Sequence, residues 1–233
     1  MSQASRTLDW RLNAFRPDLA DARLRGQVQA TRFVEGRPAH VVGTAEPLLR
    51  RPATDAPMDS QILPGEAVTV FDQSNGWAWV QCRHDGYVGY VRREALADGW
   101  PAPTHAVRAR QSVVLPDAKQ ECAPTACLSL GTPLAVADPN GRFARLEGGG
   151  YVFAGHLRPI AEAEADWVDV ARRLLGLPYL WGGRGAGGID CSGLVQVALA
   201  ACGISCLRDS DQQAGSIGEA VSTDPAVWQR GDL

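Results

Sequence analysis

The chain has 233 residues, enough for one large domain or several small ones. Apolar residues make up 45% of it and charged residues 21%, the proportions of a globular protein, which excludes wholesale disorder. The formal net charge of −3 excludes strong attraction to nucleic acid or to an anionic membrane, and no apolar run is long enough to span a membrane.

Residues 1–38 are predicted to form an N-terminal extension. This stretch carries charges throughout and lacks the apolar core of a signal peptide, so we expect no export by that route and a cytoplasmic protein. Residues 18–25 are predicted to be weakly helical, with Gly26 ending the helix. The arginines of the extension are expected to form a solvated face and not a binding patch: Arg11, Arg16, Arg23 and Arg25.

The six cysteines lie at positions 82, 122, 127, 191, 202 and 206. They show neither the paired C-x-x-C spacing of a zinc site nor the density of a disulfide scaffold. We therefore expect free thiols, with Cys202 and Cys206 packed as small apolar residues.

Residues 39–99 and 104–160 each contain short alternating apolar runs separated by turn residues, a pattern typical of small β-barrels. Asn75-Gly76 and Asp85-Gly86 are strong hairpin signals. Two triplets recur about 64 positions later: Asn75-Gly76-Trp77 as Asn140-Gly141-Arg142, and Gly86-Tyr87-Val88 as Gly150-Tyr151-Val152. The repeat predicts two barrels joined by a proline-containing linker at residues 100–103, and their pattern resembles that of bacterial SH3-like domains.

The spacing of Trp167, Val170 and Leu174 predicts a helix over residues 166–175. Gly176 follows its expected end, and Pro178 prevents it from continuing. This helix leads into a glycine-rich loop.

That loop, residues 182–188, delivers Cys191 to the start of an apolar segment at 194–201. If a helix begins at Cys191 or Ser192, its first backbone N–H groups lack partners within the helix and, with the macrodipole, favour a thiolate. Gly203 stands where a helix C-terminus favours glycine. Cys191 is therefore a candidate nucleophile, the alternative being a buried and inert cysteine.

Three ordered motifs fall within residues 179–213: Tyr179-x-Trp181-Gly182-Gly183, Asp190-Cys191-Ser192-Gly193-Leu194 and Arg208-Asp209-Ser210-x-x-Gln213. Together they resemble the NlpC-type family of bacterial cysteine peptidases, which have a papain-like core and cleave peptidoglycan peptides. The resemblance implies that Cys191 attacks the amide carbonyl, and that the Tyr179 hydroxyl and the Cys191 backbone N–H hold the oxyanion. It implies no metal ion and no organic cofactor.

The resemblance also places Asp190, Ser192 and Ser210 in the pocket for a peptidoglycan-derived peptide. In family members that begin with an SH3-like domain, an acidic residue here binds the free amine of the substrate, helped by a tyrosine from that domain. Asp190 is the residue expected to bind the amine, a role that it can combine with capping the helix, and the matching tyrosine is Tyr87, with Tyr90 as the alternative. A free amine restricts cleavage to released stem peptides, between γ-D-glutamate and the diamino acid of L-Ala-γ-D-Glu-diamino acid, which suggests murein recycling.

The expected fold is multidomain. Two small SH3-like β-barrels, at 39–99 and 104–160, precede the N-terminal part of an α+β papain-like (NlpC-type) domain at 161–233 that is truncated at its C-terminus. Without the strands that follow in the family, Leu194, Val197 and Leu199 are expected to lack apolar partners.

The expectation of truncation comes from the catalytic histidine. All four histidines precede Cys191: His40, His84, His105 and His156. In the family the histidine follows the cysteine, beyond the Gly-Asp-Leu that occupies residues 231–233 here. We therefore expect either a fragment of a cysteine peptidase or a non-catalytic protein that binds peptidoglycan peptides; neither His84 nor His156 is expected to replace the missing base. Acyl transfer would need a lipid-sized apolar pocket, which nothing in the sequence indicates.

Overall fold

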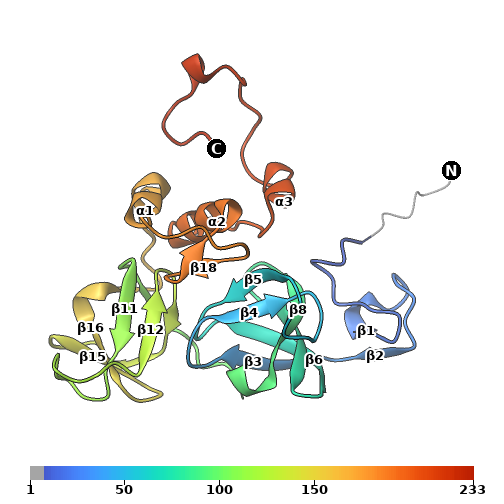
Figure 1. The fold of residues 1–233 in the computed structure, drawn as a ribbon, viewed down its shortest axis with the longest axis horizontal. Helices are drawn as coiled ribbons and strands as arrows, with labels where there is room; N and C mark the ends of the chain where they lie inside the picture. The colour runs from blue at the N-terminus through green and yellow to red at the C-terminus, as the bar shows by residue number, and fades with distance from the viewer. Residues whose placement is uncertain (1–7) are drawn as a thin grey trace.

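The computed structural model describes residues 8–233, so the first seven residues of the predicted extension lie outside the described residues. An N-terminal segment is followed by two β-rich units and then by a layer of short helices, which lies above both units in Figure 1. Among residues 8–233, no helix reaches the length and apolarity needed to cross a membrane.

The N-terminal segment is extended where the sequence predicts a helix. β1 (Leu19–Asp21) pairs in parallel with β2 (Arg32–Val34), and the helical part of residues 18–25 is limited to the 3₁₀ turn η1 (Ala22–Leu24). The helix prediction is wrong because β1 buries three consecutive residues, whereas an amphipathic helix alternates buried and exposed faces. Gly26, with φ of +82°, does follow the turn closely.

Two of the four N-terminal arginines are not on a solvated face, contrary to expectation. The Arg16 guanidinium lies 4.5 Å from the centre of the Trp79 ring and contacts the Asp72 carboxylate at 2.7 Å. Arg11 contacts aspartates about 200 positions away in the sequence. Both arginines therefore anchor the extension to the rest of the molecule.

The first β unit is a seven-stranded curved sheet. Its strands are β3 (Arg37–Val41), β4 (Glu46–Leu49), β5 (Met58–Ile62), β6 (Ala67–Ser74), β7 (Trp77–Cys82), β8 (Val88–Arg92) and β9 (Leu96–Asp98), with the turn η2 (Arg93–Ala95) before the last. They are ordered β5-β4-β8-β7-β6-β3-β9, which leaves β5 at the edge. Asn75 and Gly76 join β6 to β7 with φ of 50° and 78°, the paired positive values of a tight hairpin turn that Asn-Gly adopts readily.

The second β unit repeats this order of neighbours. Its elements are β10 (His105–Val107), β11 (Gln111–Val114), β12 (Ala126–Ser129), β13 (Pro133–Leu134), β14 (Val136–Asp138), β15 (Phe143–Leu146), β16 (Tyr151–Phe153), the turn η3 (Ala154–His156) and β17 (Leu157–Pro159). β11 pairs with β12, β15 lies between β14 and β16, and β10 lies between β13 and β17. A bridge between Leu115 and Tyr151 joins β11 to β16, as the pair Leu49–Tyr90 joins β4 to β8.

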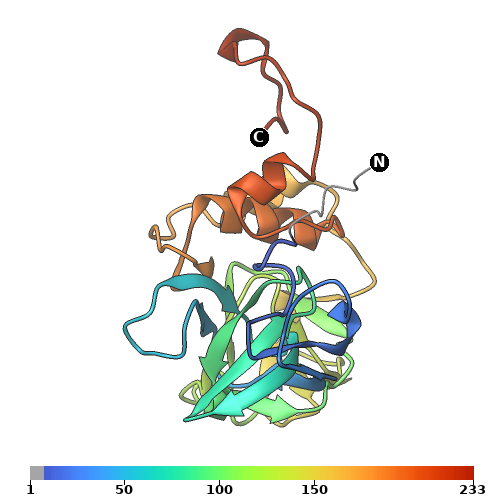
Figure 2. The same cartoon turned by 90° about the vertical axis from the view of Figure 1, so that its right-hand side faces the viewer.

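The helical layer covers the top of both units. It contains α1 (Trp167–Arg173), the short hairpin β18 (Arg184–Gly185) and β19 (Gly188–Ile189), α2 (Cys191–Ala201), α3 (Ser210–Ala214) and the turn η4 (Pro225–Val227). The helix predicted at 166–175 is confirmed as α1, which ends two residues early. After α3 the chain extends away from the body of the molecule (Figure 2).

α2 is packed more fully than expected. Val197 and Leu199 are buried, and Leu194 is half-buried. Val197 packs in one cluster with Val170 of α1 and with Leu130, which comes from the second β unit. The prediction that these side chains lack partners is therefore wrong, because α1 and the second β unit supply apolar surface to α2.

Buried polar contacts fix the β18–β19 hairpin to both β units. Arg184 is buried and donates to the Glu66 carboxylate of the first unit at 3.0 and 3.1 Å, and its backbone N–H donates to the Gln61 side chain at 2.9 Å. The Ala186 backbone N–H donates to Ser129 Oγ of the second unit at 2.8 Å. The β18–β19 hairpin is thus held between the two β units.

We expect acid to weaken this interface. Burial raises the pKa of Glu66 and of Asp85, but attraction to Arg184 and His84 outweighs it, so both pKa values lie below their ordinary values of 4.5 and 3.8. Carboxylates with lowered pKa stabilise the fold above those values, and the contribution is lost as pH falls through the folded-state pKa. The urea midpoint should therefore fall steeply below about pH 4. In Glu66→Gln the midpoint should already be lower at pH 7, because Arg184 stays buried and unpaired, and its acid-induced fall should be smaller. An unchanged acid-induced fall would contradict the assignment.

Candidate active site

Cys191 is the first residue of α2, and its side chain is exposed. Two glycines allow the surrounding loop to pack this closely. A Cβ on Gly193 would lie 2.4 Å from the Gly183 carbonyl oxygen. Gly182 adopts φ of +74°, and a Cβ there would lie 2.9 Å from the carbonyl oxygen of Met58 of β5. The prediction of a helix that starts at Cys191 is confirmed, and the alternative of a buried cysteine is excluded.

Asp190 is the N-cap of α2, and the acceptor positions of its carboxylate are all occupied. It accepts from the backbone N–H groups of Gly182 and Gly193 at 2.8 and 2.7 Å, and from both terminal nitrogens of Arg208 at 3.0 and 2.7 Å. Ser192 Oγ is a fifth donor at 3.4 Å. A carboxylate offers about four acceptor positions, so Asp190 has none left for a substrate amine. The expectation that Asp190 binds the amine therefore disagrees with the geometry, whereas its capping role is confirmed.

Arg208 connects the nucleophile helix to the first β unit. Its side chain is 1% exposed; besides Asp190, it donates to Ser192 Oγ at 2.9 Å and to Ser60 Oγ of β5 at 3.0 Å. Ser192 is buried and engaged in these bonds, so it faces the protein interior and not the substrate pocket in which we expected it. Arg208 and Ser192 therefore hold the start of α2, and with it Cys191, from the buried side of the helix.

Tyr179 and Trp181 lie on the open side of the loop. Each is 66% exposed, and a bridge between Tyr179 and Ile189 holds the tyrosine beside the strand that leads into α2. The Tyr179 hydroxyl has no hydrogen-bond partner within residues 8–233. Its placement is compatible with an oxyanion donor, and that role stays a prediction.

A second carboxylate, Asp209, directly precedes α3 and is held by a tyrosine of the first β unit. The Tyr87 hydroxyl donates to Asp209 Oδ2 at 3.0 Å, although Tyr87 itself belongs to the core of the first β unit. Burial raises the pKa of Tyr87, and the nearby charges of Asp209 and Asp59 raise it further, so the phenol remains a donor. The Asp209 side chain keeps 25% of its surface exposed. Tyr90, the alternative tyrosine, instead accepts from Arg16 at 3.2 Å.

The remaining residues of the third motif, Ser210 and Gln213, lie on α3. Ser210 is exposed at its first position, and its contact with substrate stays a prediction. Gln213 donates to the carbonyl oxygens of Ser192 and Leu207, both at 2.9 Å, which fixes α3 against the start of α2. Arg208 and Asp209 belong to this motif, but the motif alone assigns them no role. Their adjacent, opposite charges are the feature of the sequence that could have identified them as functional residues.

In the part of the chain that the structure describes, none of the four histidines contacts Cys191. Each has a partner in a β unit: His40 the Gly99 carbonyl, His84 the Asp85 carboxylate, His105 the Thr104 hydroxyl and His156 the Ser112 hydroxyl. The described residues therefore place no histidine beside the exposed thiol of Cys191.

In the described part of the chain, one group of three side chains has the residue types and spacing that could ligate a metal ion. The ligand atoms of Cys82, His84 and Asp85 lie within 4.8 Å of one another. Asp85 already accepts from the Tyr87 N–H, from His84 and from Gln196 of α2, at 3.0, 3.0 and 2.9 Å. These bonds explain the cluster as part of the interface between the first β unit and α2.

The comparisons with known proteins agree with this architecture. Residues 48–96 match the model of the bacterial dipeptidyl-peptidase SH3 domain, and residues 176–233 match the model of the NlpC/P60 family. The C-terminal part of the chain belongs to the NlpC/P60 family. An NlpC/P60 family protein from Bacillus cereus has the same fold, with a TM-score of 0.69 and 20% identity over 83% of this chain and 81% of its own.

Two curated relatives of this NlpC/P60 chain are named gamma-D-glutamyl-L-lysine dipeptidyl-peptidase. The one from Bacillus cereus is 28% identical over 76% of this chain and 59% of its own length. The one from Bacillus subtilis is 30% identical over 77% of this chain and 64% of its own length. The chain thus spans about three fifths of the length of these relatives.

Proposed function

We propose that this protein is a cysteine peptidase that hydrolyses released peptidoglycan stem peptides. The bond is the one between γ-D-glutamate and the diamino acid of L-Ala-γ-D-Glu-diamino acid. The observation that carries the proposal is an exposed thiol at a capped helix start, in a chain where a tyrosine of the SH3 domain holds a second carboxylate, Asp209. The names of the two Bacillus relatives, gamma-D-glutamyl-L-lysine dipeptidyl-peptidase, support the same bond and a dipeptide product.

In the proposed mechanism the Cys191 thiolate attacks the amide carbon. The carbon–sulfur bond forms as the carbonyl becomes an oxyanion, which the Tyr179 hydroxyl and the Cys191 N–H stabilise. Collapse of the intermediate breaks the carbon–nitrogen bond, and the diamino acid leaves with a proton. Water then hydrolyses the thioester. The base that moves these protons is proposed to be a histidine outside residues 1–233.

The substrate amine is proposed to bind Asp209. This carboxylate is partly exposed, and it adjoins Arg208, which binds Asp190 next to Cys191. An ammonium facing a held carboxylate gains a charge-assisted hydrogen bond. A peptide whose L-Ala is blocked, as in the intact wall, cannot make it, so we propose that the enzyme recycles murein peptides in the cytoplasm. The second β unit is proposed to be a further SH3-like domain, which its order of strands supports.

The test uses the protein produced from its native gene, whose mass is first compared with the 24.9 kDa of these residues. It is incubated with L-Ala-γ-D-Glu-L-Lys, and mass spectrometry follows release of L-Ala-γ-D-Glu. The N-acetylated peptide should resist cleavage, and Asp209→Asn should lower kcat/KM for the free peptide about 30- to 100-fold. Asp117→Asn, on an exposed carboxylate of the second unit, is the control. Binding of the free peptide without cleavage would favour the second candidate, a peptide-binding protein, which the lack of a histidine at Cys191 suggests.

A further inference from the structure

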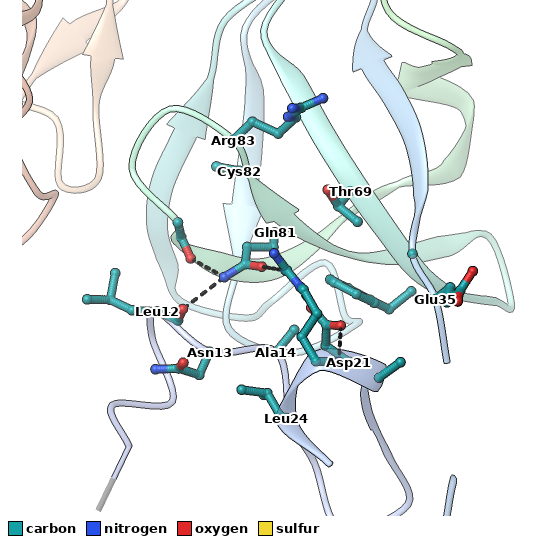
Figure 3. A pocket seen from close by; sticks show the side chains of 15 residues that line it. Leu12, Asn13, Ala14, Asp21, Leu24, Glu35, Thr69, Gln81, Cys82 and Arg83 are labelled. Carbon is teal, nitrogen blue, oxygen red and sulfur yellow. Dashed lines mark hydrogen bonds and ion pairs between the residues drawn. The ribbon is translucent and has the colours of Figure 1, made fainter. Parts of the chain in front are cut away.

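The N-terminal segment runs between the first β unit and α3. The Val88 N–H donates to the Arg11 carbonyl at 2.7 Å, and the Gln81 side chain donates to the Leu12 carbonyl at 2.8 Å. Figure 3 shows Gln81 reaching Leu12 on one side of a cavity of about 900 Å³. Main-chain contacts therefore hold this segment in place next to Tyr87.

The Arg11 side chain leaves this segment toward α3 and meets three carboxylates. It donates to Asp209 at 2.9 Å and to the two oxygens of Asp211 at 2.9 and 2.8 Å. In its own segment it donates to Asp9 at 3.1 and 2.8 Å. Hydrogen bonds to Asp211 and Asp9 raise the pKa of Arg11, and Arg11 in turn lowers the pKa of both aspartates. The guanidinium therefore stays charged, and the cluster keeps a net charge of −2.

Arg11 and Tyr87 both donate to the same oxygen, Asp209 Oδ2. These two donors fix the orientation of the carboxylate, and the Gln212 backbone N–H of the capping box is a third donor. A carboxylate offers about four acceptor positions, so Asp209 keeps capacity for one more donor. Without the guanidinium, the repulsion between the Asp209 and Asp211 carboxylates is no longer offset, and Asp209 keeps only the Tyr87 hydroxyl and the Gln212 backbone N–H as donors. The net negative charge that remains attracts a cation.

We propose that Arg11 is a positioning residue of the amine subsite. It holds Asp209 in the orientation that receives the ammonium of the substrate, so that residues 9–12 act as part of the site and not as a loose extension. The inference depends on the function proposed above. Arg11 does not need to leave when the amine arrives, because its contacts with Asp9 and Asp211 are independent of Asp209.

Binding to the full 233-residue chain, carrying Cys191→Ala to prevent turnover, tests this inference. Isothermal titration measures Kd for L-Ala-γ-D-Glu-L-Lys and for its N-acetyl derivative. Arg11→Gln should weaken binding of the free-amine peptide about tenfold and leave that of the acetylated peptide unchanged. Arg11→Lys should restore part of the loss. Arg16→Gln is the matched control, because Arg16 anchors the same segment to Asp72 and Trp79, away from Asp209.

The outcomes separate this inference from the proposed function. If the parent protein binds both peptides equally, amine recognition itself is wrong and the inference fails with it. If the parent protein prefers the free amine and Arg11→Gln keeps the same preference, only the role of Arg11 is overturned. Tighter binding by Arg11→Gln would also overturn it, since Arg11 would then compete with the substrate amine. If Arg16→Gln loses the preference for the free amine to the same extent, the effect of Arg11→Gln comes only from detachment of the N-terminal segment. The role of Arg11 in positioning Asp209 would then be overturned.

Discussion

Replacing Cys191 by alanine is expected to abolish cleavage of L-Ala-γ-D-Glu-L-Lys by the protein produced from its native gene. The thiolate is the attacking atom, and a methyl group cannot form the thioester, so kcat should fall by about 10⁴-fold or more. Binding should persist, because the proposed amine subsite is Asp209, which Tyr87 holds without any contribution from Cys191. Product release measured by mass spectrometry and Kd measured by titration give the two readouts.

Another cysteine of the same helix provides the control. Cys202 caps the far end of α2, where burial and the nearby Glu164 and Asp166 raise the pKa of its thiol. Cys202→Ala should retain nearly all activity, since this thiol lies at the opposite end of α2, eleven residues after Cys191. Turnover that survives Cys191→Ala would refute the nucleophile assignment, whereas loss in both variants would point to misfolding of α2.

Local signals explain what the sequence predicts well. Asp190, Cys191 and the glycines before them specify a capped helix start, and the cap bond from Gly193 spans only three residues. Asn75-Gly76 specifies a tight hairpin, because these two turn residues by themselves determine the geometry of the turn. In both places a few neighbouring residues are sufficient, and the helix and the hairpin lie where they are predicted.

The sequence does not distinguish the saturated carboxylate of Asp190 from the partly exposed carboxylate of Asp209, because the contacts of both depend on distant residues. Tyr87 and Asp209 are 122 positions apart, and Arg11 and Asp209 are 198. Two neighbouring motifs each contain an aspartate, and the residue type does not reveal which carboxylate is already saturated. Only the position of Arg208 against Asp190 decides it, leaving Asp209 as the available acid.

The failed helix at residues 18–25 has the same origin. Residue preferences there favour a weak helix, but tertiary contacts outweigh them, because β1 buries all three of its side chains. Arg11 and Arg16 likewise look like surface charges in the sequence. They have structural roles only because the folded chain brings acidic partners to them.

Arg208→Met is expected to destabilise the protein strongly and to disorganise the site. It leaves the Asp190 carboxylate buried without its cation, and it removes the bond to Ser60 that ties α2 to the SH3 domain. Removing one partner of a buried pair costs about 3–5 kcal/mol, a large part of the stability of a domain. The urea midpoint at pH 7 measures the loss.

A double-mutant cycle separates the buried charge from the lost packing. Asp190→Asn removes the charge while its amide oxygen still accepts from the loop, so adding it to Arg208→Met should recover part of the lost stability. Arg230→Met is the matched control, because Arg230 also pairs with two aspartates, Asp166 and Asp169, but at the exposed surface, where its loss should change the midpoint little. If Arg208→Met and Arg230→Met shift the midpoint equally, the Arg208–Asp190 pair does not hold the nucleophile helix. A large shift for Arg208→Met alone would mean that the position of Cys191 depends on a salt bridge that is itself anchored in the SH3 domain, so that the barrel forms part of the active site.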